Sequence, residues 1–166
     1  PNCQNSNLGF FGRGTQKIEQ EVGRMFPEAK IMRLDADTAK KIKKPEVALN
    51  AFSEGEADIL VGTQMVLKEL GAANVGLIGI ISADTALSIA DFRSSERTYQ
   101  MLSLVLNAAT LHPAPERIVI QTQHPDHFAL QCAIRQDYAA FYAEELKQRL
   151  ELRYPPYSKL ISLLIY

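Results

Sequence analysis

The stretch ADILVGTQMVLKEL, residues 57–70, decides the fold class, because an apolar run ends there in a small polar turn and a helical pattern follows. Gly62, Thr63 and Gln64 stand where a buried strand would run out of hydrophobic residues. Backbone N–H groups and the dipole of the next helix converge at such a turn, which makes it a natural place to hold a phosphate. This stretch predicts an α/β fold with a phosphate-holding turn at a strand end.

The same form recurs in VGLIGIISADT, residues 75–85. This apolar run ends in the polar residues Ser82, Asp84 and Thr85. If the two strands are adjacent and parallel, both polar tips lie at one edge of a sheet. We therefore expect the functional site at that edge.

The rest of the chain repeats the order of strand followed by helix. Further strands are predicted at 8–11, 29–35 and 116–122, and helices at 16–26, from Pro45, at 63–70, at 92–106, and as a pair within 125–154 that divides near 136–138. Residues 36–44 read as a polar loop with four lysines, Lys40, Lys41, Lys43 and Lys44. Predicted inner faces are Val47, Leu49, Ala51 and Phe52 of one helix and Tyr99, Leu102, Val105 and Leu106 of another. A mostly parallel sheet with helices on both faces accounts for this order.

Length and composition set the broad class. The chain has 166 residues, of which 46% are hydrophobic, enough for one α/β core. The chain has 18 Lys and Arg and 19 Asp and Glu, so its net charge is close to zero. Nucleic-acid or membrane binding therefore cannot be inferred from the overall charge. Two cysteines do not make a disulfide framework, and no apolar run approaches the ~20 residues of a membrane span. We expect a cytoplasmic location without membrane attachment.

A phosphate-loop motif, GxxxxGK followed by Ser or Thr, is absent from the sequence. The chain therefore lacks a self-sufficient triphosphate cradle of that kind. Either it is not an NTPase or it is half of one.

Six segments in a fixed order resemble a known family. They are GFFGRGTQKIEQEV (9–22), FPEAKIMRLDADT (26–38), GEADILVGTQMVLKEL (55–70), NVGLIGIISADTAL (74–87), DFRSSERTYQML (91–102) and RQDYAAFYAEELKQRLELRYPPYSKL (135–160). Together they resemble the second RecA-like lobe of the bacterial replication-restart helicases of the PriA family. The resemblance implies a RecA-like three-layer lobe over residues 9–155, a remnant of a zinc-module edge at 1–8, and the start of a further domain at 156–166.

In that family ATP, with magnesium, sits between this lobe and a first lobe that carries the phosphate loop, while single-stranded DNA crosses both. The resemblance implies DNA contacts at Gly12, Gly14, Thr15, Thr63, Gln64 and Lys68, and nucleotide contacts at Gly62 and Asp84. For Thr15 an N-cap role is equally suitable, and the two roles are compatible. Implied partners are forked or single-stranded DNA, other primosome proteins and the first helicase lobe.

The sequence departs from the family pattern in two places. After Lys68 it has Glu69, and Gly71 and Ala72 replace an acidic and aromatic pair. In the later motif QVAGRAGR the chain reads LVLNAATL, so that Ala108 and Leu111 stand at the arginine-finger positions. An arginine finger is worth roughly 10³ to 10⁵ in rate. The fragment alone is therefore expected to be inactive.

Three functions remain open at this point. One is a DNA-binding and primosome-assembly scaffold, and another is the lobe of an active ATP-dependent helicase. The third is an unrelated α/β phosphate-binding enzyme, for which Asp84 is the one carboxylate at the expected edge.

Metal binding has little support in the sequence itself. Cys3 resembles part of a zinc pair and could hold the metal only with cysteines that this sequence lacks. His124 and His127 precede a predicted helix and suit a loop and a cap, and Cys132 reads as a core residue. No cofactor is expected in the fragment, whereas the resemblance implies structural zinc in the whole protein. We expect any DNA binding by the fragment to be weak and strongly salt-dependent.

Overall fold

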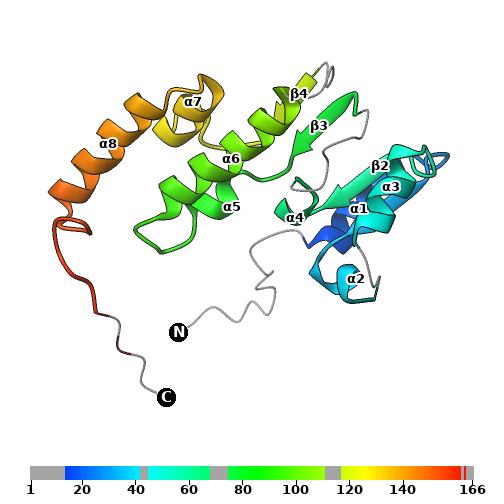
Figure 1. The fold of residues 1–166 in the computed structure, drawn as a ribbon, viewed down its shortest axis with the longest axis horizontal. Helices are drawn as coiled ribbons and strands as arrows, with labels where there is room; N and C mark the ends of the chain where they lie inside the picture. Colours follow the sequence, from blue (N-terminus) through cyan, green and yellow to red (C-terminus); the bar gives the residue numbers. More distant parts are fainter. Residues whose placement is uncertain (1–13, 42–44, 68–74, 111–116, 162, 164–166) are drawn as a thin grey trace, which may run out of the picture. The chain divides into compact units, whose positions relative to one another are not determined.

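The structure, a computed structural model, describes residues 14–41, 45–67, 75–110, 117–161 and 163. The chain divides into two compact units. Unit 1 comprises residues 1–76 and 111–115, and unit 2 comprises residues 77–110 and 116–166. Figure 1 labels the helices and strands of both units.

Unit 1 contains two parallel strands and four helices among its described residues. In chain order they are α1 (Thr15–Met25), β1 (Ile31–Leu34), α2 (Ala36–Lys41), α3 (Pro45–Ser53), β2 (Ile59–Gly62) and α4 (Gln64–Leu67). β1 pairs with β2 in a register that sets Ile31 opposite Ile59 and Leu34 opposite Gly62. Because the paired strands are parallel, both run out at the same edge of the sheet, and the residues that follow Leu34 and Gly62 are brought together there.

The core of unit 1 is small and lies over this strand pair. Leu34, Leu49 and Val66 are all less than 9% exposed and form one cluster with Ala48. Met32 and Leu60, from the two strands, pack against it. Val66 belongs to α4, the short helix after β2, so the turn between β2 and α4 is anchored to this core.

Unit 2 repeats the parallel pairing and adds a larger helical layer. Its elements are β3 (Leu77–Ile80), α5 (Asp84–Leu87), α6 (Ser94–Thr110), β4 (Arg117–Ile120), α7 (Phe128–Ile134) and α8 (Tyr138–Glu151). β3 pairs with β4 and Ile80 lies opposite Ile120. α6 packs on α7 and on α8, which Figure 1 shows as successive helices of this unit.

The core of unit 2 is built from α6, α7 and α8. Leu102 and Leu130 are at most 1% exposed, and Phe141 is 4% exposed. The rings of Tyr99 and Phe141 are stacked with centroids 4.1 Å apart. Ile120 of β4 packs against this cluster, so the strand pair lies against the helices. Aromatic stacking of this kind adds about 0.5–1.5 kcal/mol beyond the burial of apolar area.

Several sequence predictions are confirmed. The structure is α/β with parallel strands, as expected for a RecA-like lobe, and Pro45 opens a helix. The predicted stripe of Tyr99, Leu102 and Val105 is buried. The helical region near the C-terminus is divided at Gln136, whose φ of 55° ends α7 before Asp137 caps α8.

The expected pairing of the two opening strands is not found among the described residues. β2 pairs with β1 and β3 pairs with β4. In each pair the two strands are joined by two helices, which return the chain to the start of the sheet beside the strand just completed. The polar tips after β2 and after β3 therefore lie at the edges of two separate pairs.

Three local predictions are wrong. Residues 36–41 are helical rather than loop, because Asp35 caps the first turn. Val47 is 58% exposed, since α3 turns Ala48 and Leu49 toward the strands instead. The strand predicted from residue 159 is absent at its described residues 159–161 and 163, because a strand needs backbone partners and the described part of the chain offers none there.

Candidate functional site

The carboxyl edge of the β1–β2 pair brings together several of the predicted DNA-binding residues. Asp35 follows β1, while Thr63 and Gln64 follow β2 at the matching level of the sheet. Thr15, the first residue of α1, is joined to this edge by a hydrogen bond from its Oγ1 to Asp35 Oδ2, at 2.5 Å. The start of α1 and the turn after β2 are thus both held at the edge of one sheet.

The N-cap role considered for Thr15 is wrong. Gly14 is the N-cap residue and has no side chain with which to cap, while Thr15 lies inside the first turn and gives its hydroxyl proton to Asp35. Gly14 is exposed, and an added Cβ would meet nothing within 4 Å. Among the described residues, the amide end of α1 is therefore open on the Gly14 side, whereas the Thr15 hydroxyl is hydrogen bonded to Asp35.

Asp35 organises this edge and was missed in the sequence. Its Oδ1 accepts hydrogen bonds from the backbone N–H groups of Asp37, at 3.0 Å, and Thr38, at 2.8 Å. Arg33 Nε lies 3.3 Å from its Oδ2. The Thr15 hydrogen bond, followed by the amide of Thr38, holds the pKa of this carboxyl well below its usual range although burial opposes the shift. The pattern Asp-x-x-Thr before a helix was the available signal.

Gly62 is required by packing. A Cβ at this position would lie 2.1 Å from Val66 Cγ2 and 2.7 Å from the Leu34 carbonyl oxygen. Thr63 and Gln64 beside it are exposed, and the Thr63 carbonyl accepts a hydrogen bond from Val66 N at 3.0 Å. Close packing behind Gly62 thus presents Thr63 and Gln64 to solvent, which suits the DNA contacts predicted for these two residues.

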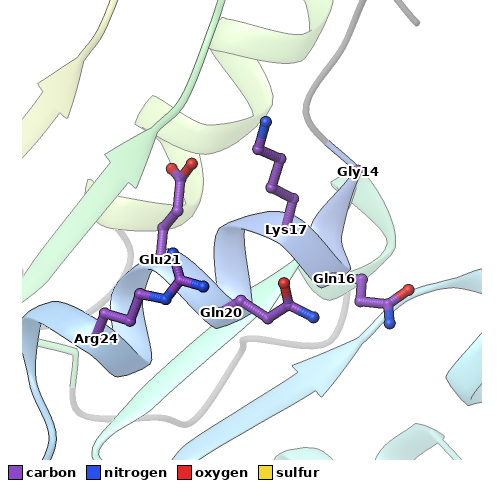
Figure 2. Close-up of a pocket in the computed structure, with 6 residues that line it drawn as sticks. All are labelled: Gly14, Gln16, Lys17, Gln20, Glu21 and Arg24. Carbon is purple, nitrogen blue, oxygen red and sulfur yellow. The ribbon is translucent and has the colours of Figure 1, made fainter. Parts of the chain in front are cut away.

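A hollow of about 480 Å³ lies along α1 in unit 1. Figure 2 shows that its side chains all come from this one helix and its cap; they are Gly14, Gln16, Lys17, Gln20, Glu21 and Arg24. Two cations and two amides against one carboxylate form a surface rich in hydrogen-bond donors. Lys17 and Arg24 were missed in the sequence, where their spacing of seven residues was the signal that they share a face.

The carboxyl edge of the β3–β4 pair is closed by Asp84. Its Oδ1 accepts the hydroxyl of Thr122 at 2.6 Å, and its Oδ2 accepts the backbone N–H of Gln123 at 2.8 Å. The Thr122 hydrogen bond is the main cause of the lowered pKa of Asp84. Ser82, with φ of 56°, exchanges a hydrogen bond with Thr85 at 2.9 Å. Both oxygens of Asp84 accept hydrogen bonds from the residues that follow β4, which makes it a poor general base.

Four of the predicted site residues lie outside the described residues. They are Cys3, Gly12, Lys68 and Leu111. The same holds for Lys43 and Lys44 of the basic run. Ala108 lies in the last turns of α6, and the structure places its backbone only.

The cap predicted at His127 and the core position predicted for Cys132 are confirmed. His127 is the N-cap of α7 and accepts a hydrogen bond from Ala129 N through Nδ1 at 3.2 Å, while burial lowers its pKa. Cys132 packs against the helical core, and burial raises the pKa of its thiol. Within the described ranges, no three His, Cys, Asp or Glu side chains gather as metal ligands would. No helix in those ranges is both long and apolar enough to cross a membrane.

Comparison with known proteins finds several relatives that share one name. No protein-family model matches the chain. The replication restart protein PriA of Bacillus subtilis is 45% identical over 157 residues, which are 95% of this chain and 20% of that protein. PriA of Synechocystis sp. is 42% identical over 98% of this chain and 20% of its own length, and PriA of Chlamydia pneumoniae is 39% identical over 97% and 22%. The chain thus spans about one fifth of the length of these relatives.

Proposed function

We propose that this chain, which is homologous to one segment of the replication restart protein PriA, is a DNA-binding lobe that has lost the arginines needed for ATP hydrolysis. In this proposal the lobe serves as a scaffold for DNA and for other primosome proteins. The observation that carries the proposal is the pair Ala108 and Leu111, which stand where the family resemblance calls for arginine fingers. The family resemblance places the two positions by the matching residues on either side, Gln100 before them and 119–122 after them.

The missing arginines are not replaced by Arg93 and Arg97, the two arginines that precede them on the N-terminal side. Arg93 and Arg97 lie at the start of α6, and both pair with Asp91 at 3.1 Å. A helix rises about 1.5 Å per residue, so Arg97 lies about 16 Å from Ala108 along the helix axis. An arginine side chain cannot span that distance. Loss of the fingers removes about 4–7 kcal/mol of transition-state stabilisation, enough to end useful turnover.

DNA binding by the lobe is supported by the surface of unit 1. The open cap at Gly14, the cations Lys17 and Arg24, and the exposed Thr63 and Gln64 offer donors suited to backbone phosphates. Such contacts fix position without reading sequence, as expected of a protein that would recognise forked or single-stranded DNA by structure. Family resemblance adds Gly12 and Lys68 to this surface, and Gly62 and Asp84 to an ATP–magnesium site completed by a first lobe. Structural zinc would belong to a separate module that includes Cys3.

The test is single-turnover ATP hydrolysis by the full-length protein that contains this chain, measured with forked DNA. We expect turnover indistinguishable from the protein-free reaction. The double substitution Ala108→Arg and Leu111→Arg is expected to raise the rate, whereas Gln100→Arg, which adds a cation on an exposed part of the same helix, is not. DNA-stimulated hydrolysis by the unmodified protein would overturn the scaffold proposal and favour an active ATP-dependent helicase.

Fluorescence anisotropy with labelled forked DNA tests the binding half of the proposal separately. We expect binding that weakens steeply as salt rises, because phosphate contacts release counterions. Affinity that is unaffected by salt would exclude the phosphate contacts. The remaining alternative, an unrelated α/β phosphate-binding enzyme, loses support because both carboxylate oxygens of Asp84 are occupied by hydrogen bonds.

A further inference from the structure

We infer that Arg93 and Arg97, at the start of α6 in unit 2, bind a backbone phosphate of a single-stranded nucleic acid whose sugar or base enters the hollow beside them. The inference deepens the proposed function, on which it rests, by naming a nucleic-acid contact in the second unit. It uses residues to which neither the comparisons nor the family resemblance assigns a role.

The first observation is that two exposed arginines share a single carboxylate. Arg93 Nη2 and Arg97 Nη2 both lie 3.1 Å from the same oxygen, Oδ2 of Asp91. Arg93 Nε also donates to Asp91 Oδ1 at 3.2 Å. The two arginine side chains remain 48% and 47% exposed. Two guanidinium groups thus share one carboxylate and keep donors turned to solvent, where a second anion can reach them.

The opposite arrangement lies at the more buried end of the same cluster of charged side chains. Arg149 of α8 is 14% exposed and donates to Glu96 of α6 and Glu145 of α8, each at 2.7 Å. These two carboxylates are therefore directed at Arg149. Of these two carboxylates Glu145 is buried, while Glu96 keeps 35% of its side chain exposed, and the two arginines that share Asp91 are the more exposed members of the cluster.

Aromatic contacts hold the guanidinium groups in place. The guanidinium carbons of Arg93 and Arg149 each lie 5.2 Å from the centroid of the Phe92 ring, within reach of a cation–π attraction. Tyr154 packs against the same ring with centroids 5.6 Å apart. An arginine whose position is already fixed loses less conformational freedom when it binds an anion.

The second observation is a hollow of about 360 Å³ directly beside this cluster. Asp91, Phe92 and Arg149 line it together with Ile89, Leu152 and Tyr154. Ile89 is 49% exposed and Leu152 is 63% exposed, although both are apolar. The volume falls within the range of about 300–1,000 Å³ usual for small-molecule sites.

The two observations together favour a nucleic-acid strand over an acidic peptide. A guanidinium fork recognises either phosphate or carboxylate. The hollow next to the fork combines apolar and aromatic side chains, such as Ile89 and Tyr154, with polar ones such as Gln148, which suits a base or a sugar. Base–aromatic contacts are worth about 1–3 kcal/mol per base in single-strand binding. A run of acidic residues would supply the anion but no ring for the aromatic side of the hollow.

The test measures anisotropy of labelled oligo(dT) bound to the 166-residue chain over a range of salt concentrations. We expect the double substitution Arg93→Gln and Arg97→Gln to weaken binding about tenfold. It should also flatten the salt dependence by about 0.7, the value for one phosphate on a single strand. Asp91→Asn removes the competing charge but keeps an oxygen to accept the backbone N–H of Arg93, so it should tighten binding about two- to fivefold.

The matched control is Arg135→Gln, an exposed arginine in the same unit whose side chain contacts Gln131 at 3.4 Å. It should leave both affinity and salt dependence unchanged. Thermal melts of all variants confirm that each folds. Unchanged binding by the folded Arg93 and Arg97 double variant would overturn the inference, and so would equal competition by poly-glutamate and by unlabelled oligo(dT).

A second measurement separates this inference from the proposed function. The Nε–H signals of the arginines are followed by NMR as the dinucleotide thymidylyl-thymidine is added. Movement of the Arg93 and Arg97 signals with no oligo(dT) binding would support the subsite and refute the proposed DNA-binding lobe. Oligo(dT) binding that leaves these signals unmoved would refute the subsite and leave the proposed function standing. If the arginine signals do not move and oligo(dT) does not bind, the subsite and the proposed function are both refuted.

Discussion

Replacing Gly62 with alanine places a methyl group inside the carboxyl edge of the β1–β2 pair. The added Cβ would lie 2.1 Å from Val66 Cγ2, 3.3 Å from Val66 Cβ and 2.7 Å from the Leu34 carbonyl oxygen. Val66 is 7% exposed and β-branched, so its side chain cannot rotate freely away. Leu34 is held by the strand pairing in register with Gly62. Neither neighbour can move without disturbing the core of unit 1.

Overpacking of this kind costs about 1–3 kcal/mol, and two simultaneous clashes place Gly62→Ala at the upper end of that range. With a urea dependence of about 1–3 kcal/mol per molar, the unfolding midpoint should fall by about 1 M. The assay is urea unfolding followed by hydrogen exchange of the β1 and β2 amides, which reports on unit 1. All six tyrosines lie between residues 99 and 166, so tyrosine fluorescence reports on unit 2 in the same samples.

Gly79→Ala is the matched control. Gly79 also lies in a parallel strand, but an added Cβ there meets nothing within 4 Å. We expect this variant to be neutral or slightly stabilising, because alanine restricts the unfolded chain. The double variant Gly62→Ala with Val66→Ala should recover only part of the loss, since the contact with the Leu34 oxygen remains. Equal midpoints for Gly62→Ala and Gly79→Ala would refute the packing argument.

Three further predictions follow from the charged and apolar cores. Because the folded-state pKa of Asp35 is depressed, its contribution to stability is full above the unfolded pKa of about 3.9 and is lost as pH falls toward the folded value. Asp35→Asn should therefore cost about 1–3 kcal/mol of folding stability at neutral pH and should flatten the acid limb of a stability titration followed by circular dichroism. An unchanged acid limb would contradict this argument. Arg149→Met leaves the carboxylate of Glu145, a residue 7% exposed, without its guanidinium partner. It should destabilise the chain by about 3–5 kcal/mol in thermal melts, and by less when Glu145→Gln is added. A double variant that recovers no stability would argue against the ion pair. Leu102→Ala should cost about 2–5 kcal/mol of folding stability, measured by urea unfolding, because this side chain is fully buried. Leu104→Ala, at a residue of the same helix that is 38% exposed, should cost far less. Similar losses of stability in the two variants would show that burial at Leu102 is not the cause.

Periodicity in the sequence was sufficient for the long helices and for the strands. A helix is the arrangement that places Tyr99, Leu102 and Val105 on one buried face. A strand is likewise indicated by the short apolar run at β2. Short elements were harder, because α2 depends on a cap. Its helical state comes from two backbone hydrogen bonds to the Asp35 carboxylate, which outweigh the polar composition of residues 36–41.

The sequence could also indicate which residues stand at functional positions, but not what engages them. Thr15 and Asp84 were both selected as binding residues, and in the structure their polar atoms are hydrogen bonded to Asp35 and Thr122. Those partners are 20 and 38 residues away in the chain, beyond the range of any local pattern. Arg93 and Arg97 showed the reverse: their shared carboxylate, Asp91, is close in sequence, but the hollow beside them is completed by side chains of α8.

The amino-acid sequence by itself therefore determined the fold class, the relationship to PriA and the absence of arginine at Ala108 and Leu111, because these depend on residue identity and order along the chain. Tertiary structure alone decided that β1 pairs with β2 and β3 with β4, that Gly62 is a packing requirement against Leu34, and that Arg149 pairs with Glu96. Those features depend on distances between residues far apart in sequence, which are set when helices and strands pack and not by either segment alone.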